Sequence, residues 1–195
     1  MEGARIFYGR KDQYYLAWPV RGRPDILPAT GQDRCFDSGG RRINCRGTGQ
    51  DGEVGAGVPW PAPRFIFEKD WVVDRLTGLC WLQQADLTGG PGSWQQALDA
   101  VARMNKDSAR RGLNWRLPSI NELESLVDCS THSPALPDGH PFQAVRDTYW
   151  SSTTSCFEPA WAWALYFRKG ALGVGIKKGV HFYTWPVRGP LGIRA

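Results

Sequence analysis

The sequence contains the pentapeptide WPVRG twice, at residues 18–22 and again at residues 185–189. The residues before each pentapeptide also align without gaps, so that residues 3–22 match residues 170–189 at eight identical positions. Self-similarity of this kind is the signature of repeated units, and it constrains the fold before any single motif does. Each copy reads as an apolar run, a basic turn and an aromatic run, which is the pattern of a β-hairpin.

We interpret residues 1–23 as the terminal hairpin of a preceding repeat and residues 24–195 as the domain that follows it. The last hairpin of that domain would then be residues 170–189. On this interpretation the natural chain is a tandem array. The alternative is a chance resemblance between two unrelated hairpins.

The composition favours short strands and turns over a helical bundle. Hydrophobic residues make up 42% of the 195 residues, which is enough to form a core. Ten Trp residues accompany 23 Gly and 14 Pro, which predicts many turns and aromatic packing. No apolar run approaches the roughly 20 residues of a membrane-spanning helix, so we expect no membrane span.

Five cysteines favour an oxidising compartment over a zinc site. Cys35 and Cys45 flank a Gly-Gly turn, and this arrangement predicts a disulfide that closes a small loop. Cys129 and Cys156 are candidates for a second bridge, which would leave Cys80 unpaired. Zinc ligands cluster at short spacings such as paired C-x-x-C motifs, and the sequence has none. We expect a secreted, periplasmic or surface protein; the alternative is five buried thiols in a cytosolic one.

Charge is distributed unevenly along the chain, whose net charge is +5. Residues 1–46 carry nine basic and five acidic residues, residues 47–160 carry nine basic and fourteen acidic ones, and residues 161–195 carry six basic and no acidic ones. If the two basic ends meet in space, their common surface attracts anions. The alternatives are plain solubility and attraction between these ends and the acidic middle.

Two helices are predicted from start signals of the capping-box type. The first begins at Ser93 with Gln96 three residues on, and Gly112 is its expected end. Four basic residues near that end form a second cationic patch or compensate the helix dipole: Arg103, Lys106, Arg110 and Arg111. The second helix begins at Ser119 with Glu122, and its buried stripe is expected to include Ile120, Leu123, Leu126 and Val127.

The remaining regular structure is expected to be β. Residues 65–67 and 71–74 predict a hairpin, and residues 79–82 a third strand. Residues 160–167 predict a strand with alanine at positions 160, 162 and 164 of one face, over which another group can pack closely. Its other face carries large side chains: Trp161, Trp163, Leu165 and Phe167. Residues 171–176 repeat this arrangement, with small residues opposite Leu172, Val174 and Ile176.

Six segments, in this order along the chain, resemble the Lcl C-terminal-like domain, a bacterial domain of otherwise unknown function. They are LPATGQDRCFD…INCRGTGQDG (27–52), VDRLTGLCW (73–81), SWQQAL (93–98), NWRLPSINELESLVD (114–128), YWSSTT (149–154) and WPVRG (185–189). The resemblance covers residues 27–189. Cys80 stands where the family commonly has Met, which argues against a disulfide at that position.

This resemblance implies a C-type lectin-like α+β fold with two helices, a twisted antiparallel sheet, long irregular loops and adjacent chain ends. Members of the family occur as tandem domains on secreted, periplasmic or surface proteins, in agreement with the partial copy at residues 1–23. The family is named for an adhesin that binds sulfated polysaccharides. Other members are variable receptors, diversified by retroelements, that bind through the C-terminal sheet. The resemblance therefore implies binding, although a fold alone does not fix a function.

The motifs for calcium-dependent sugar binding and for catalysis are absent from the sequence. Lectins of this fold bind Ca²⁺ through sequences such as EPN and WND, whereas residues 158–160 read EPA and WND does not occur. Asp51 and Glu53 lack the full spacing of a calcium loop. The three histidines have no recognisable nucleophile beside them. We expect no enzymatic activity, no cofactor and no metal.

Basic residues at the turns of the last sheet are the candidate ligand-binding residues. They are Arg168, Lys169, Lys177 and Lys178, with Arg10 and Lys11 at the matching turn of the first copy. Such a cluster can bind sulfate or carboxylate groups through charge-assisted hydrogen bonds. The alternative is that they are solvated turn residues.

We expect a non-enzymatic, adhesin-like module that binds anionic polysaccharide and no nucleic acid. The alternative is a protein-binding or self-assembly module, acting as packed tandem repeats, a homo-oligomer or a variable receptor. Trp18, Trp161, Trp163 and Trp185 can stack on sugar rings if they are exposed, but the alternation along their strands predicts that most lie in the core.

Overall fold

The computed structural model describes residue 11 and residues 14–22, 24–107, 110 and 112–189. Its helices are α1 (Asp51–Val54), α2 (Trp94–Lys106) and α3 (Ile120–Glu124). Its strands are β1 (Cys35–Phe36), β2 (Arg42–Ile43), β3 (Phe65–Glu68), β4 (Trp71–Asp74), β5 (Cys80–Leu82), β6 (Thr148–Thr154), β7 (Trp161–Tyr166), β8 (Ala171–Ile176) and β9 (Val187–Arg188). The predicted α+β class is confirmed.

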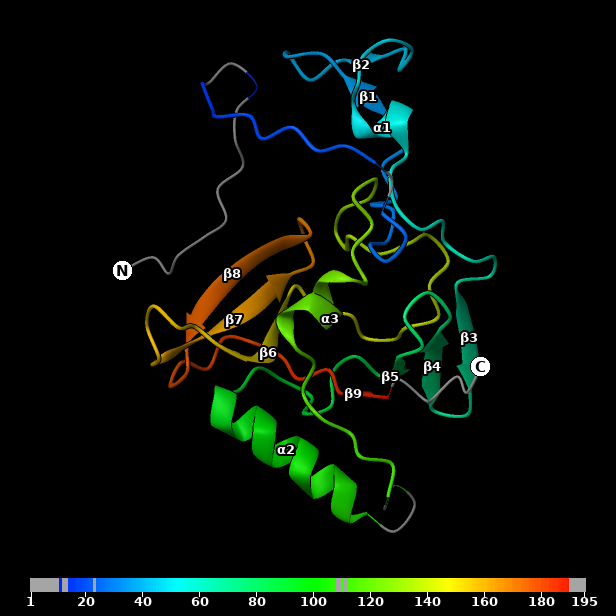
Figure 1. Cartoon of the computed structure of the whole chain (residues 1–195). Helices are drawn as coiled ribbons and strands as arrows, with labels where there is room; N and C mark the ends of the chain where they lie inside the picture. The colour runs from blue at the N-terminus through cyan, green and yellow to red at the C-terminus, as the bar shows by residue number, and fades with distance from the viewer. Residues whose placement is uncertain (1–10, 12–13, 23, 108–109, 111, 190–195) are drawn as a thin grey trace.

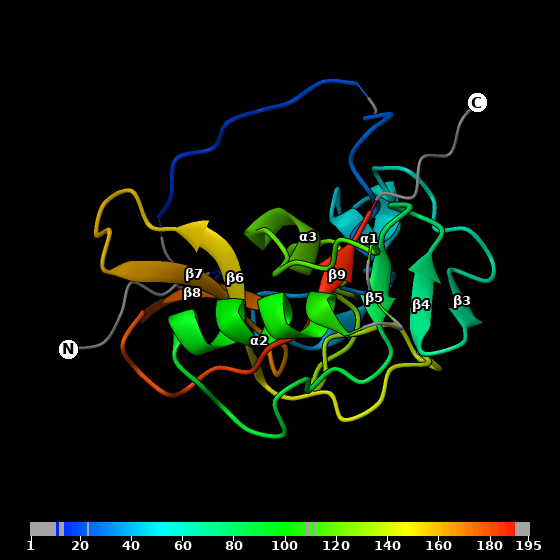
Figure 2. The ribbon, with the colours of Figure 1, turned by 90° about the horizontal axis from the view of Figure 1, so that it is seen from below.

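The larger β-structure consists of two antiparallel sheets, which long loops connect (Figure 1). One has the strand order β3-β4-β5-β9 and the other the order β6-β7-β8, while β1 and β2 form a separate hairpin. Helix α3 lies between the two sheets in both views, and α2 runs alongside them (Figures 1 and 2). The chain returns from the second sheet to close the first, because β9 pairs with β5 through Trp81 and Val187.

Helix α2 begins as the sequence predicts. The Ser93 side chain accepts a hydrogen bond from the backbone N–H of Gln96, and the Gln96 side chain accepts one from the backbone of Ser93. The helix ends at Lys106, however, and not near Gly112. Arg110 therefore lies beyond the helix, where it forms an ion pair with Asp70.

Helix α3 also has its predicted capping box, formed by Ser119 and Glu122. It is only five residues long, so the expected buried stripe extends past its end: Leu123 is inside the helix and Leu126 outside it, and both are fully buried. Short helices of this kind depend on tertiary packing for their stability. The signal in the sequence thus identified the helix start but overestimated its length.

The face of β7 and β8 that carries the predicted alanine and glycine residues is closely packed, as predicted. Ala162 and Ala164 are fully buried and pair with Gly175 and Gly173 across the two strands. A Cβ atom on Gly175 would overlap the ring of Phe182. The small residues therefore allow an aromatic side chain to approach the backbone of the sheet.

Trp185 lies at the centre of the core. Its indole N–H donates to the carbonyl of Leu82 at 2.8 Å. Ring centroids of four aromatic residues lie between 4.8 and 5.7 Å from its own: Trp81, Phe142, Tyr149 and Phe167. The Trp residue of the second WPVRG copy thus joins the elements that form both sheets.

The predicted disulfide between Cys35 and Cys45 is confirmed, with an S–S distance of 2.11 Å, and it closes the β1–β2 hairpin. The predicted second bridge is wrong, because Cys129 and Cys156 are both free and exposed. The backbone of Cys129 is bonded to Thr30 at 2.9 Å, whereas Cys156 lies in the connection between β6 and β7. The two thiols belong to different parts of the fold.

The first WPVRG copy has no secondary structure in its described part. Residues 14–22 form no strand, and the remainder of the hairpin expected at residues 1–23 lies outside the described residues. Tyr14, Leu16, Trp18 and Val20 are exposed. Among the described residues, only the second copy enters a sheet, so residues 14–22 do not form a strand beside it.

Candidate binding surface

The four basic residues predicted near the end of the chain do not form one cluster. Arg168 and Lys169 lie in the turn between β7 and β8, whereas Lys177 and Lys178 follow the other end of β8 (Figure 1). Strand β8 is six residues long, and a strand rises about 3.3 Å per residue, so about 20 Å separates the two turns. A hairpin necessarily places its successive turns at opposite ends.

Lys177 is occupied by contacts within the domain. Its ammonium group lies 4.3 Å from the ring centroid of Trp94 and donates to the hydroxyl of Thr154 at 2.8 Å. Its carbonyl accepts a hydrogen bond from the Trp94 backbone at 3.0 Å. These contacts attach the start of α2 to the second sheet, so Lys177 has a structural role in addition to its charge.

The cations of the first copy are also separate from those of the second. Lys11 donates to the backbone carbonyl of Phe36 at 2.8 Å, on the β1–β2 hairpin. Figure 1 shows this hairpin far from the end of β8, where Lys178 lies. Arg10 lies outside the described residues. The shared cationic surface that we expected at the two chain ends is thus not formed by Lys11 and Lys178.

The turn that carries Arg168 and Lys169 borders an open hollow of about 610 Å³, lined also by His132 and Ser133. A second hollow of about 370 Å³ adjoins it and shares Ser133 and Arg168. Both basic side chains are exposed. The sequence gave no indication of His132 and Ser133, because their position beside β7 depends on a loop that returns from α3 to the sheet.

Backbone hydrogen bonds fix the shape of this hollow. The N–H of Arg168 donates to the carboxylate of Asp147 at 2.7 Å, and the N–H of Ser133 donates to the Arg168 carbonyl at 3.1 Å. The N–H of Phe167 donates to the Asp147 carbonyl at 2.6 Å. Three segments distant in the sequence are thereby tied together, so the basic turn is ordered before any ligand arrives.

Two tryptophans expected in the core are partly exposed. Trp161 and Trp163 lie on one face of β7, opposite the fully buried Ala162 and Ala164. The alternation was correctly predicted, but both faces contribute to the core: Leu165 and Phe167 are fully buried on the face of the two tryptophans, and the small residues on the other face lie against Phe182. Trp185 is fully buried, as the alternation predicted for most of these residues.

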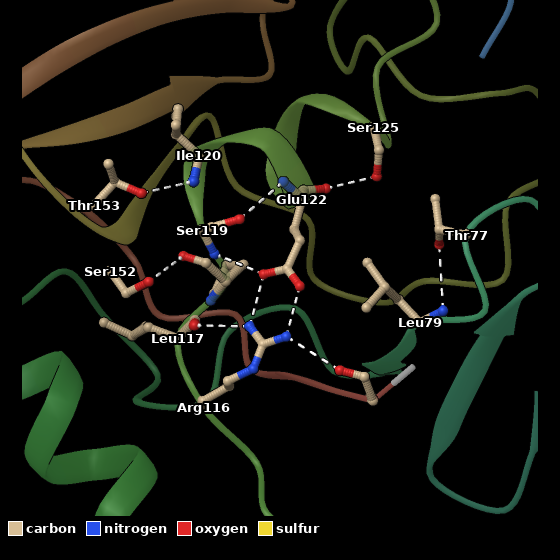
Figure 3. Close-up of polar contacts among 12 residues, drawn as sticks. Thr77, Leu79, Arg116, Leu117, Ser119, Ile120, Glu122, Ser125, Ser152 and Thr153 are labelled. Atoms are coloured by element: carbon tan, nitrogen blue, oxygen red, sulfur yellow. Dashed lines mark hydrogen bonds and ion pairs between the residues drawn. The ribbon is translucent and has the colours of Figure 1, made fainter. Parts of the chain in front are cut away.

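Arg116 and Glu122 form a polar network beside the end of the second copy (Figure 3). The guanidinium donates two hydrogen bonds of 2.6 Å to the Glu122 carboxylate and a third, of 3.2 Å, to the carbonyl of Gly189. The backbone of Arg116 also exchanges two hydrogen bonds of 2.9 Å with Val187. The motif NWRLPSINE thus attaches the end of the WPVRG segment to the helix cap.

This geometry explains the titration behaviour of the pair. Burial opposes ionisation of Glu122, but hydrogen bonds from Arg116 and from the Ser119 backbone outweigh burial and lower the pKa of the carboxyl group below 4.5. The hydrogen bonds to Glu122 likewise raise the pKa of Arg116. The network therefore stabilises the folded chain and leaves no free carboxylate for catalysis at this position.

The acidic side chains of residues 50–53 (QDGE) accept hydrogen bonds from nearby loop residues. The Glu53 carboxylate accepts hydrogen bonds from the backbone N–H groups of Gly47 and Gly49, at 2.5 and 2.7 Å. These bonds lower its pKa. The Asp51 carboxylate accepts a hydrogen bond from the Thr30 hydroxyl. Among the described residues, no group of three or more His, Cys, Asp or Glu side chains could bind a metal ion.

Comparison with known proteins identifies the family. No curated protein and no solved structure matches the chain significantly. In the part of the chain that the structure describes, no helix is long and apolar enough to cross a membrane. The model of the Lcl C-terminal domain matches residues 70–188, which is more than half of the chain. The protein therefore belongs to the Lcl C-terminal domain family.

Proposed function

We propose that the protein is a non-enzymatic, adhesin-like module that binds anionic polysaccharide at the hollow bordered by Arg168 and Lys169. The observation that carries this proposal is the position of two exposed basic side chains on a turn whose backbone is fixed by the neighbouring loop. Sulfate and carboxylate groups along a polysaccharide would accept charge-assisted hydrogen bonds from these side chains.

The electrostatics of the turn support the proposal. Among the described residues, the Arg168 guanidinium forms no ion pair or hydrogen bond, so its donors face solvent. The nearby Arg146 is paired with Asp86 at 3.1 Å, and its charge is partly compensated. A cation without a partner can bind an incoming anion without first breaking an internal ion pair, which favours Arg168 as the main contact.

The proposal includes a C-type lectin-like fold and a location outside the cytosol. Antiparallel sheets, two capped helices, long loops and a closing strand beside β5 support the fold. The Cys35–Cys45 disulfide supports an oxidising compartment, where such bonds persist. An experimental structure that superposes on C-type lectin domains with the same strand order would establish the finer fold.

Heparin affinity chromatography tests the binding proposal. The double variant Arg168→Glu/Lys169→Glu should elute at a clearly lower salt concentration than the parent, because two contacts to the anion become repulsive. Arg103→Glu/Lys106→Glu on α2 is the matched control, since it changes the net charge equally at another exposed site. Equal shifts for both variants would mean that only net charge matters, and the hollow would not be the binding site.

A protein-binding or self-assembly function is the second candidate, and it too has a specific observation in its favour. Trp161 and Trp163 present partly exposed indoles on the last sheet, close to Ile176, which is 43% exposed. An apolar surface of this kind is typical of interaction sites. Substitution of both tryptophans by Ser should leave heparin elution unchanged, whereas loss of a partner or of oligomers would favour this second function.

A further inference from the structure

The first WPVRG copy has apolar side chains that the domain itself does not cover. Trp18 is 93% exposed and Val20 is 92% exposed, whereas their counterparts Trp185 and Val187 are both at 0%. Large apolar side chains exposed in a row are costly in water and indicate a surface that another group covers. The question is which surface fits this segment.

The second copy shows what such a surface consists of. We use the term closing socket for the groove that residues 182–189 occupy. Its aromatic part surrounds the Trp185 ring, and its edge is formed by β5 and by the backbone of Arg116. At its far end the Arg188 guanidinium lies between the rings of Trp71 and Trp115, at 4.6 and 5.4 Å from their centroids.

The first copy matches the second at most of the positions that the closing socket buries. Residues 185–188 are buried and are identical to residues 18–21. Phe182 is buried and corresponds to Tyr15, which is also aromatic. His181 is exposed and corresponds to Tyr14, which is exposed as well. The first copy therefore keeps residues 185–188 but differs at two other contact positions: the buried Thr184 corresponds to Ala17, and Tyr183, whose ring lies 6.4 Å from that of Tyr149, corresponds to Leu16.

The local backbone agrees with this correspondence. Gly22 has φ = +103° and Gly189 has φ = +90°, a conformation that favours glycine over residues with a side chain. In the second copy this turn presents the Gly189 carbonyl to Arg116. The first copy thus takes the same turn at its end although no socket surrounds it.

We infer that residues 14–22 are the closing segment of a second domain of the same family, and that they insert into that domain's closing socket as residues 181–189 insert into this one. The partner is a neighbouring Lcl C-terminal domain that has no other segment in its closing socket. The socket of the described domain is already filled by its own second copy, so the segment cannot return to it. This linkage joins the described domain directly to the neighbouring one through residues 14–22, and it is independent of the proposed ligand.

A full-length chimera tests whether the first copy fits the socket. Five substitutions (Val180→Gln, His181→Tyr, Phe182→Tyr, Tyr183→Leu and Thr184→Ala) make residues 180–189 identical to residues 13–22. The chimera should unfold cooperatively with a Tm within about 10 °C of the parent, because four buried residues are unchanged. Loss of the cooperative transition, measured by circular dichroism, would overturn the inference.

A tandem chain tests the insertion itself. Residues 24–179 followed directly by residues 13–195 place Trp18 at the socket position of the first unit. Calorimetry should give an unfolding enthalpy about twice that of the single chain, since enthalpy scales with folded length. Trp18→Ala should lower the Tm of one of the two units in the tandem chain and should not change the Tm of the single chain. Unchanged tandem transitions in Trp18→Ala, or an enthalpy of one unit in the parent tandem, would contradict the inference.

Discussion

The same five residues, WPVRG, are exposed at residues 18–22 and buried at residues 185–189. Both copies have the same local propensities and end in a glycine of positive φ. The difference is that only the second copy is surrounded by aromatic rings, by strand β5 and by Arg116. Burial is thus a property of the surroundings and not of the pentapeptide, and each prediction below tests this comparison.

The largest difference is expected for the two tryptophans. Trp185→Ala removes a fully buried indole that contacts four rings and donates to Leu82, and should cost about 3–5 kcal/mol of unfolding free energy. Trp18→Ala in the single chain should cost close to nothing, because Trp18 is exposed. Urea unfolding of the two variants measures both values, and similar losses would contradict the burial difference between the copies.

A smaller difference is expected for the two arginines. The Arg188 side chain packs between Trp71 and Trp115, so Arg188→Ala loses two cation–π contacts and the packing of its alkyl chain, about 2 kcal/mol. Arg21 is exposed, and Arg21→Ala is the matched control with no expected effect. Thermal unfolding at one salt concentration compares the two. If Arg188→Lys lowers the stability as much as Arg188→Ala does, then stability at this position depends on the planar guanidinium group and not on positive charge alone.

The smallest effect concerns the pH dependence of the Arg116–Glu122 network. The pKa of Glu122 is lowered on folding, so its contribution to stability is present above pH 4.5 and is lost as the pH falls through the folded-state pKa. Glu122→Gln should therefore cost about 1 kcal/mol at pH 7, and the difference from the parent should shrink below pH 4.5. The control is Glu124→Gln, an exposed position on the same helix. A difference that does not change with pH would contradict the prediction, because it would mean that ionisation of the Glu122 carboxyl group does not cause the effect.

Local signals in the sequence were sufficient for several elements. Capping boxes at Ser93 and Ser119 correctly located the two helix starts, because the cap depends on residues three positions apart. The Cys35–Cys45 bridge was predicted for the same reason, since a short loop brings both residues together. Helix ends were less accurate, because packing and not propensity decides where a short helix stops.

The candidate site was only partly accessible from the sequence. Arg168 and Lys169 were identified as basic turn residues, and the structure places them beside a hollow. Their neighbours His132 and Ser133 come from a distant loop that no local pattern connects to β7. The charge counts likewise suggested that the two basic ends of the chain form one surface. In the structure, Lys11 contacts the β1–β2 hairpin, whereas Lys178 lies beyond the end of β8.

By itself, the sequence determined the repeat, the strand alternation, the helix starts and the family motifs, all of which depend on residues close together in the chain or on direct comparison of two segments. Only the tertiary structure decided which WPVRG copy is buried, which side chains of β7 are fully buried and which cations lie together. The physical reason is that burial and charge clustering depend on contacts between distant segments, and identical residues give opposite outcomes when those contacts differ.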